Sequence, residues 1–385
     1  MSSLIVKVCP IDKVLPHSNA DKLEIAHIGG WQVICKKDEY RIGDLTIFVP
    51  PDSVLPQDLI DKHGVASYLA TGNRVKAVKL RGEKSFGLLL KPENGWREGQ
   101  DVAGTLGITK WEPPPPTQGL AGSGSKTQQA KRHPLWQRYT EIENVRHYRS
   151  VLSEDEQVVC VEKCHGCNVS ISMLNGELVV SSHNYNRQPP CKYTERKLNW
   201  IQRQIRNLGR RFNKNWLGPI CEIDEAGKVD DWYWHATTIP GVLTLLQDLA
   251  ETHKQVILYG ECFGRVQKGM NYGSPEGLKF AAFDLLIDGK YLDYDAFALA
   301  CATYHVPRLP VIYRGLYRFE TIMEIANGNT MIDGAPSNQI REGIVVRPVK
   351  ERNEPRCGRV IFKAINDDYL MKQYTKDAVG DQKDE

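Results

Sequence analysis

The chain has 385 residues, of which 41% are hydrophobic and 25% are charged, and its formal net charge is +3. This length and hydrophobic content predict two or three domains that fold without help. The small positive charge does not identify a nucleic-acid partner by itself, so that function requires local basic patches. The absence of any run of eighteen apolar residues argues against a membrane-spanning helix.

The first residues, MSSLIVKVCPIDK, lack the basic flank and the long apolar core of a secretory signal. Ten cysteines are scattered along the chain, apart from one group at 160–167, and they do not form the framework of a disulfide-rich protein. We therefore expect reduced thiols in a soluble intracellular protein. A cytoplasmic location is expected, and a nuclear one remains compatible with the sequence.

Residues 1–111 carry the pattern of a small antiparallel barrel. Short runs of β-branched and aromatic residues alternate with turn signals such as Gly29-Gly30. The predicted strands are 4–8, 22–28, 31–37, 44–49, 74–80 and 86–91. Such a barrel is typical of an OB fold, a fold that often binds nucleic acid.

Five cations in one hairpin region of this barrel are candidates for gripping a nucleic-acid backbone. They are Arg74, Lys76, Lys79, Arg81 and Lys84. The domain as a whole is nearly neutral, so a purely structural or partner-binding role is the alternative.

The stretch 112–130 is rich first in proline and then in glycine and serine, and it has almost nothing to bury. It contains GLAGSGSKT, which comes close to a phosphate-binding G-x4-G-K-[ST] loop. Its lysine is one place late and no apolar strand precedes it, so the context of a phosphate loop is missing. We interpret the stretch as a linker.

Residues 131–385 predict a second, larger domain that mixes strands and helices, which makes the whole chain α+β. The expected strands are 158–163, 168–174, 177–182, 255–261, 279–287, 343–348 and 359–365. The pair Asp288-Gly289 predicts a two-residue hairpin turn after the fifth of these strands.

Between the third and fourth of these strands, apolar residues with helical spacing predict a helix with a basic outer face within 191–215. Four cations there are candidates for contacting phosphates: Arg203, Arg206, Arg210 and Arg211. A merely solvated helix face is the alternative.

The segment 160-CVEKCHGCN-168 places three cysteines in a C-x3-C-x2-C array. Three thiolates at such a spacing can hold an iron–sulfur cluster, so Cys160, Cys164 and Cys167 make an iron–sulfur enzyme a remote alternative. The alternation of Val159 and Val161 with polar neighbours indicates a strand, however, whereas cluster cysteines need a loop on which their sulfurs converge.

The same segment contains Lys163 in the sequence EKCHGCN, with His165 where many relatives have aspartate. It resembles the K-x-H-G-x-N variant of the nucleophile motif in the covalent nucleotidyltransferases, which comprise polynucleotide ligases and mRNA capping enzymes. Four further motifs follow in the order of that superfamily. They are LYGECFG at 258–264 with Glu261, FAAFDLL at 280–286 with Phe283 and Asp284, EGIVVRP at 342–348 with Glu342 and Arg347, and IFKAIND at 361–367 with Lys363.

The order of domains narrows the resemblance. DNA ligases and capping enzymes of this superfamily place an OB domain after the catalytic one, yet only about 20 residues follow Lys363 here. The chain resembles the OB-first RNA ligases, with a core like that of RNA ligase 2. The resemblance implies an N-terminal OB-like β-barrel, 1–111, followed at 131–385 by an ATP-grasp-like adenylyltransferase domain of antiparallel sheets flanked by helices.

The resemblance also implies an ATP-dependent RNA ligase that seals 5′-phosphate and 3′-hydroxyl ends of nicked or broken RNA through a lysyl-AMP intermediate, using Mg²⁺ or Mn²⁺. Lys163 is then the nucleophile, and we expect neighbouring cations to lower the pKa of its amine. The implied nucleotide contacts are Glu162, His165, Glu261, Phe283, Arg347, Lys363 and Arg187, with His183 as an alternative to Arg187. Asn168 and Asp284 are expected to contact RNA ends or metal, and Glu342 and Glu261 to hold the metal.

Other functions remain as alternatives at this point. Within the superfamily they are a DNA ligase and an mRNA guanylyltransferase. From another class, a non-catalytic RNA-binding protein would use the same barrel and basic helix. For any of these we expect a monomer without a membrane partner.

Overall fold

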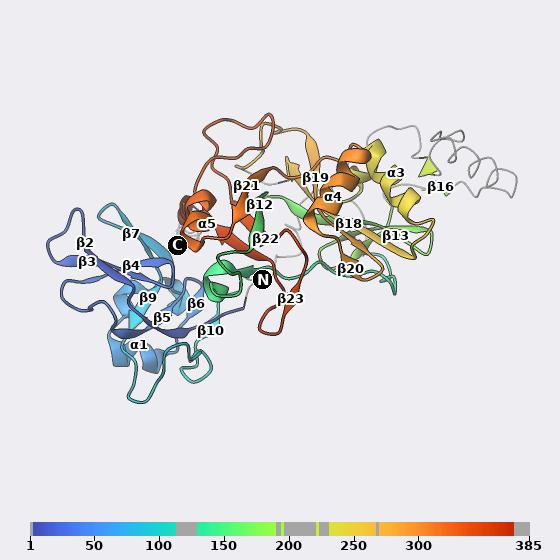
Figure 1. The fold of residues 1–385 in the computed structure, drawn as a ribbon. Coiled ribbons are helices and arrows are strands. Elements are labelled where there is room, and N and C mark those ends of the chain that lie inside the picture. The colour runs from blue at the N-terminus through green and yellow to red at the C-terminus, as the bar shows by residue number, and fades with distance from the viewer. Residues whose placement is uncertain are drawn as a thin grey trace, which may run out of the picture.

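The computed structural model describes residues 3–112, 129–189, 194–195, 221–222, 231–266 and 269–372. The N-terminal strands form one body beside a larger part that contains two sheets (Figure 1). Most of the expected linker lies outside the described residues, as does nearly all of the expected basic helix with its four candidate arginines. Among the described residues, no helix is long and apolar enough to cross a membrane.

The N-terminal domain consists of short antiparallel strands, and its main sheets have the orders β1-β5-β9 and β2-β3-β4. Its strands are β1 (Lys7–Pro10), β2 (Lys13–Pro16), β3 (Leu23–Ile28), β4 (Trp31–Lys36), β5 (Leu45–Val49), β6 (Ser53–Val54), β7 (Ala77–Leu80), β8 (Glu83–Phe86), β9 (Leu88–Leu90) and β10 (Thr109–Lys110), and its helices are α1 (Gln57–His63), η1 (Ala66–Tyr68) and η2 (Thr71–Asn73). The strands enclose two apolar clusters, one around Val8 and Ile47 and one around Trp31 and Phe86. Burial alternates along β4, which explains why its period-2 pattern was readable.

Two details of this domain differ from the sequence prediction. Strands β2 and β8 were not predicted. Strand β7 begins at Ala77 rather than at residue 74, because the amide of Val75 donates instead to the carbonyl of Ser53 (2.8 Å). The segment before β7 thus pairs with the β6 region and turns away from the hairpin.

The larger part of the chain contains a five-stranded sheet of order β11-β25-β22-β12-β21 and a six-stranded sheet of order β15-β14-β13-β18-β19-β20. Its strands are β11 (Glu143–Asn144), β12 (Gln157–Lys163), β13 (Cys167–Leu174), β14 (Glu177–Ser182), β15 (Asn186–Arg187), β16 (Thr194–Glu195), β17 (Cys221–Glu222), β18 (Gln255–Gly264), β19 (Leu278–Ile287), β20 (Lys290–Tyr291), β21 (Val311–Leu316), β22 (Gly343–Pro348), β23 (Asn353–Glu354), β24 (Gly358–Arg359) and β25 (Phe362–Ile365). Its helices are η3 (Val145–Tyr148), η4 (Trp234–Thr238), α3 (Pro240–Leu249), α4 (Tyr294–Thr303) and α5 (Phe319–Ala326).

Most of the predicted strands of this part are present. The turn Asp288-Gly289 joins β19 to β20, and both of its residues have positive φ (44° and 80°), as a tight two-residue hairpin requires. The strand expected at 359–365 is divided into β24 and β25, because the amide of Val360 donates to the carbonyl of Arg352 and not to β22. This break turns β25 toward the neighbouring sheet strand and brings its residues beside β22.

The two parts meet at a buried arginine. Arg146 of η3 donates to the carbonyl oxygen of Gly30 (2.9 Å) and lies over the ring of Trp31, 3.9 Å from its centroid. Its guanidinium also pairs with Asp367 (3.2 Å) near the end of the described chain. Gly30 has a positive φ (83°), and a Cβ at this position would lie 2.5 Å from the ring of Phe319, so a side chain here would force that ring to move.

The same interface makes stability depend on pH. Burial lowers the pKa of His147 to about 4, and the charges of Lys7, Arg146 and Lys363 act in the same direction against that of Glu143. Between pH 6.5 and 4 the unfolded chain therefore binds a proton that the folded chain does not, so stability falls as pH falls. We expect wild-type protein to lose about 2 kcal/mol more than His147→Gln between pH 7 and pH 5. Urea unfolding at the two pH values measures this difference, and equal losses in both proteins would contradict it.

Candidate active site

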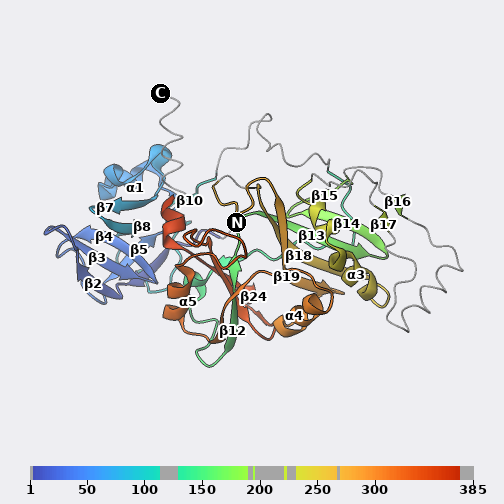
Figure 2. The same cartoon turned by 90° about the horizontal axis from the view of Figure 1, so that it is seen from above.

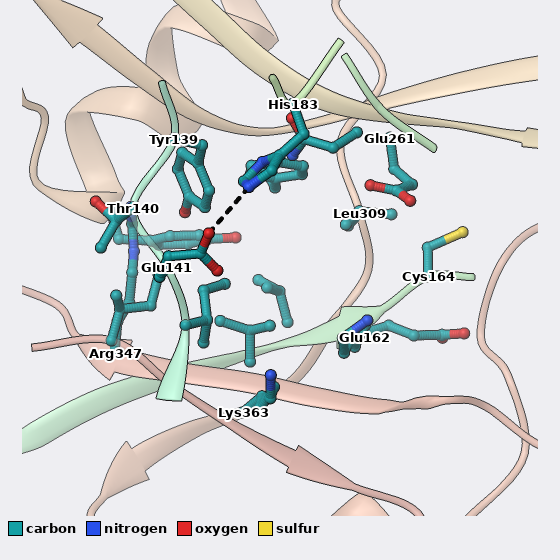
Figure 3. A pocket seen from close by; sticks show the side chains of 18 residues that line it. Tyr139, Thr140, Glu141, Glu162, Cys164, His183, Glu261, Leu309, Arg347 and Lys363 are labelled. Carbon is teal, nitrogen blue, oxygen red and sulfur yellow. Dashed lines mark hydrogen bonds and ion pairs between the residues drawn. The ribbon is translucent and has the colours of Figure 1, made fainter. Parts of the chain in front are cut away.

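A pocket of about 270 Å³ lies between the two sheets of the larger part (Figure 3). Its walls come from β12, β13, β18, β19, β22 and β25, together with the segment that precedes β11. It is lined by Tyr139, Thr140, Glu141, Ile142, Val161, Glu162, Lys163, Cys164, Asn168, His183, Glu261, Phe283, Tyr294, Leu309, Val345, Arg347, Ile361 and Lys363. Residues from all five sequence motifs therefore meet in one place.

Lys163 is the last residue of β12, where it lies opposite Gly343 of β22. This register places it beside Glu342, and the Nζ of Lys163 donates to Oε1 of Glu342 at 2.5 Å. Glu342 is 8% exposed, so the pair is largely withdrawn from water.

The turn from β12 to β13 depends on a glycine. A Cβ on Gly166 would lie 2.3 Å from the carbonyl oxygen of Cys262 and 3.0 Å from Cγ of Glu261. The turn can therefore lie directly against β18, where Asn168 pairs in register with Glu261. This contact brings Glu261 into the pocket beside Lys163.

The electrostatics of the pocket differ from the expectation that cations lower the pKa of Lys163. Burial alone would lower that pKa, but the carboxylate of Glu342 outweighs burial and raises it. Burial and the charge of Lys163 instead lower the pKa of Lys363. Burial raises the pKa of Glu261 to about 8, which Lys163 only partly offsets. Without a ligand, Lys163 is thus a charged amine in an ion pair.

His165 lies on the other side of Glu342. Its backbone amide donates to the hydroxyl of Tyr272 (2.7 Å), and its Nδ1 lies 3.5 Å from Oε2 of Glu342. Burial opposes ionisation of Glu342, but the charge of Lys163 and the side chain of His165 together prevail and lower its pKa. Glu342 is therefore shared between the lysine and the histidine of the same motif.

Aromatic rings form one wall of the pocket. The rings of Tyr139 and Phe283 meet edge to face with centroids 4.9 Å apart. Phe283 is the extra residue of a β-bulge, because Asp284 pairs with Tyr259 whereas Ala282 pairs with Gly260. The bulge interrupts the alternation of β19 at the residue that lines the pocket.

Asp284 is not placed where a contact with RNA ends or metal is expected. It is 0% exposed, and its carboxylate pairs with Arg347 (2.9 Å) and Arg359 (2.6 Å) and accepts a hydrogen bond from Tyr139 (2.9 Å). Arg347 lines the pocket, but its guanidinium is also within 3.2 Å of Glu351. The charges of these groups neutralise one another inside the protein. The expected contact of Asp284 with RNA ends or metal is corrected accordingly.

Glu162 is also engaged by the protein itself. It is 0% exposed, and its two oxygens accept hydrogen bonds from the hydroxyl of Thr330 (2.5 Å) and the amide of Met331 (2.7 Å). Its carboxylate therefore anchors the segment before β22, although the residue lines the pocket. This arrangement does not support a side-chain contact between Glu162 and a nucleotide.

Of Arg187 and its alternative His183, only His183 lines this pocket. It is bonded to Arg138 and lies 3.3 Å from Glu141 (Figure 3). Arg187 instead lies over the ring of Tyr233 and lines a separate cavity near residues 130–134. The assignment of Arg187 to the nucleotide is corrected accordingly.

The five candidate cations of the N-terminal domain do not form one exposed patch. Arg74 is 5% exposed, pairs with Asp52 (2.7 Å) and lies over the ring of Trp111, so it is not available to RNA. Lys84 pairs with Asp368 (2.9 Å). Lys79 and Arg81 are exposed on the β7–β8 hairpin, and Lys76 is partly exposed just before it.

The three cysteines of the motif do not converge. Cys160 packs with Val158 and Phe362, Cys164 packs in a different cluster, and Cys167 packs against a third. No group of three or more potential metal-binding His, Cys, Asp or Glu residues occurs within the described ranges. The alternative of an iron–sulfur centre on these cysteines is therefore wrong.

Several residues around the pocket were not predicted from the sequence. Tyr139 and Glu141 precede β11 in a segment without periodic pattern, and Tyr272 lies in a connection with positive φ (50°). Tyr369 lies just beyond the last motif, and its hydroxyl is 3.0 Å from Nδ1 of His165. Nothing local to these residues signals their position.

A buried lysine beside two glutamates and a second lysine, in a pocket between two largely antiparallel sheets, fits the covalent nucleotidyltransferases that the sequence motifs resemble. A family model described as RNA ligase matches residues 156–365, more than half of the chain, and a model of an OB-fold domain matches residues 5–92. The chain therefore belongs to the RNA ligase family, with an OB-fold domain before the ligase core. A search of curated protein sequences found no match.

Several solved structures of an RNA ligase from Naegleria gruberi share the fold. The structure with PPi is 22% identical to this chain, with a TM-score of 0.65, and the match covers 97% of this chain and 99% of that one. A point mutant with ATP and Mn is 20% identical, with a TM-score of 0.66, and a second with AMP and Mn is 21% identical, with a TM-score of 0.66. Both of these matches cover 96% of this chain and 99% of the other. The fold, including the leading OB domain, is thus shared along nearly the whole chain.

Proposed function

We propose that this RNA ligase uses ATP to join a 5′-phosphate end to a 3′-hydroxyl end of RNA through an adenylate carried on Lys163. The observation that carries the proposal is the position of Lys163: its amine faces Glu342 and Glu261 in the pocket that also contains Lys363 and the ring of Phe283. Relatives of the same fold were solved with ATP, AMP and PPi. In the complete joining reaction ATP is the substrate, PPi leaves in the first step and AMP leaves in the last.

In the first step, the neutral amine of Lys163 would attack the α-phosphorus of ATP. The Nζ–P bond forms, the bond between the α-phosphorus and the bridging oxygen breaks, pyrophosphate leaves, and the amine loses a proton. Because Glu342 raises the pKa of Lys163 in the ligand-free state, we propose that nucleotide binding separates this ion pair. Lys363, whose pKa is lowered, is the cation placed to offset charge on the phosphates.

The chain offers oxygen ligands for a divalent metal. We assign this role to Glu342 and Glu261, with Asn168 beside Glu261 as a contact to the metal or the RNA ends. Two carboxylates suit Mg²⁺ or Mn²⁺, which are commonly held by one or two carboxylates together with substrate phosphates and water. When bound, the metal would neutralise phosphate charge during the transfer.

In the second step the adenylate would pass from Lys163 to the 5′-phosphate of RNA, and in the third the 3′-hydroxyl would attack that phosphate and release AMP. We propose nicked duplex or broken RNA as the substrate, and we assign contacts with its phosphate backbone to Lys79 and Arg81, which are exposed on the OB domain. The prediction that Arg203, Arg206, Arg210 and Arg211 contact RNA phosphates stays a proposal, and gel-shift assays on their alanine variants test it.

We further propose a division into an OB domain at 1–111, a linker at 112–130 and an adenylyltransferase domain at 131–385. The two family matches fall inside the first and third ranges and support the division. We also propose that the enzyme is an intracellular, cytoplasmic monomer. The free thiols of the described residues suit a reducing compartment, and light scattering of purified protein tests the oligomeric state.

A sealing assay with two matched substrates and two nucleotides, four reactions in all, tests the proposed function. Nicked duplexes carry a 5′-phosphate and a 3′-hydroxyl on either RNA or DNA strands, and each is incubated with Mn²⁺ and either ATP or GTP. We expect joining of the RNA nick with ATP. Sealing of the DNA nick in preference to the RNA nick would contradict RNA as the substrate, and transfer of a nucleotide from GTP alone would favour a guanylyltransferase.

The role of Lys363 leads to a separate prediction. Replacing Lys363 with alanine removes a cation from the phosphate side of the pocket, so adenylylation of the enzyme is expected to slow by about 10²- to 10³-fold. Lys363→Arg is the matched control, because it keeps the charge, and it is expected to retain most of the wild-type rate. Incorporation of label from ATP labelled at the α-phosphate measures both. Equal rates in Lys363→Ala and wild type would remove Lys363 from the phosphate site.

A further inference from the structure

A helical turn at residues 367–372 connects the N-terminal domain with the active site. It follows β25 directly and lies beside the N-terminal domain (Figure 2). Asp368 pairs with Lys84 of the β7–β8 hairpin (2.9 Å), and Leu370 and Met371 pack against the apolar cluster of the N-terminal domain. The turn is therefore held by a domain that contributes no residue to the walls of the pocket.

The start of this turn is held from the opposite side by the ligase core. The amide of Asn366 donates to the carbonyl of Glu342 (2.9 Å), and the side-chain oxygen of Asn366 accepts hydrogen bonds from the amides of Asp368 (2.8 Å) and Tyr369 (3.3 Å). Asp367 pairs with the buried Arg146. With both ends held in this way, the backbone of Tyr369 has little freedom.

From this turn, Tyr369 reaches the histidine of the nucleophile motif. Its hydroxyl is 3.0 Å from Nδ1 of His165, and the two rings meet edge to face with centroids 5.6 Å apart. The same Nδ1 lies 3.5 Å from Oε2 of Glu342, whose other oxygen holds Lys163. The hydroxyl thus contacts the same ring nitrogen that lies nearest to Glu342.

We infer that Tyr369 is a positioning residue that orients His165 within the row Lys163, Glu342 and His165. This inference rests on the proposed function of that site. Neither Tyr369 nor His165 lines the pocket, so the hydroxyl of Tyr369 acts on the reaction through the contacts that join His165 to Glu342 and Glu342 to Lys163. Because the turn that carries Tyr369 is packed on the N-terminal domain, the orientation of His165 depends on the docking of that domain.

The test compares Tyr369→Phe with Tyr313→Phe. The first variant keeps the ring and removes the hydroxyl beside His165, whereas the second removes a hydroxyl that donates to the carbonyl of Leu316 (2.8 Å) outside the pocket. Adenylylation by Tyr369→Phe is expected to slow about fivefold, the effect of one hydrogen bond. Tyr313→Phe should match wild type, and both variants should keep the wild-type melting temperature.

A double-mutant cycle separates positioning from a general structural role. In a His165→Asn background, Tyr369→Phe is expected to cause no further loss, because the group that it orients is already absent. A full additional fivefold loss in that background would overturn the inference, as would a wild-type rate in Tyr369→Phe alone.

A readout without activity keeps the inference separate from the proposed function. Nitrogen-15 NMR of protein with labelled histidine reports the protonation and hydrogen bonding of each ring nitrogen. The Nδ1 signal of His165, assigned by its loss in His165→Asn, is expected to shift in Tyr369→Phe and to stay unchanged in Tyr313→Phe. A shift without any ligase activity would contradict only the proposed function, whereas an unshifted signal would overturn the positioning role itself.

Discussion

Replacing Lys163 with alanine is expected to abolish transfer of adenylate to the protein and to reduce sealing of RNA by more than about 10³-fold, because the bond to phosphorus forms at its amine. Label from ATP on the protein and joining of a nicked RNA measure the two effects. The position of the amine, 2.5 Å from Glu342 at the edge of the pocket, is the basis for this expectation.

Lys163→Arg is the matched variant for this prediction. Arginine can keep the ion pair with Glu342, but its guanidinium stays protonated and is not a nucleophile. We therefore expect Lys163→Arg to fold with wild-type stability and to accept no label. Label on either variant would assign the nucleophile to another residue.

Replacing Asp284 with alanine is expected to destabilise the ligase core by about 3–5 kcal/mol, since it leaves the two buried arginines Arg347 and Arg359 with Glu351 as their shared counter-charge. Burial disfavours the charged form of Asp284, but the two arginines outweigh it and lower its pKa. The stabilisation is therefore present above the pKa of the unfolded carboxyl and is lost as pH falls through the folded value. The midpoint of urea unfolding at neutral pH measures the cost.

An exposed ion pair provides the control for Asp284. Asp295 pairs with Arg314 at 2.6 Å, but the two side chains are 56% and 48% exposed. Asp295→Ala is expected to change stability by no more than about 1 kcal/mol. If Asp284→Ala were as mild as Asp295→Ala, the buried group of charges would not be the structural element described above.

The sheets could be predicted from the sequence because their strands carry a clear pattern. Residues 157–163, 177–182 and 343–348 are short apolar runs bounded by turn signals, and they form β12, β14 and β22. The helices were harder to predict. In α4, only Tyr294, Phe297 and Cys301 are buried, and its remaining alanines and leucine give no strong apolar stripe.

The nucleophile motif was readable because its residues are local, whereas the partners of those residues come from distant parts of the chain. Glu342 and Tyr369 both approach His165 from more than 170 residues away. The misplacement of Asp284 has a related cause, because the bulge at Phe283 breaks the alternation from which strand faces are inferred. Arg187 was assigned, with His183 as the alternative, from the resemblance of the segment after the strand at 177–182 to that of the family, but its strand, β15, lies at the edge of the six-stranded sheet.

Peptide mapping by mass spectrometry after incubation with ATP and Mn²⁺, without RNA, tests the central claim most directly. We expect one adenylate, carried on the peptide that contains Lys163 and removed when RNA with a 5′-phosphate is added. An adenylate on a different residue, or none on protein shown to be folded and free of bound AMP, would contradict it.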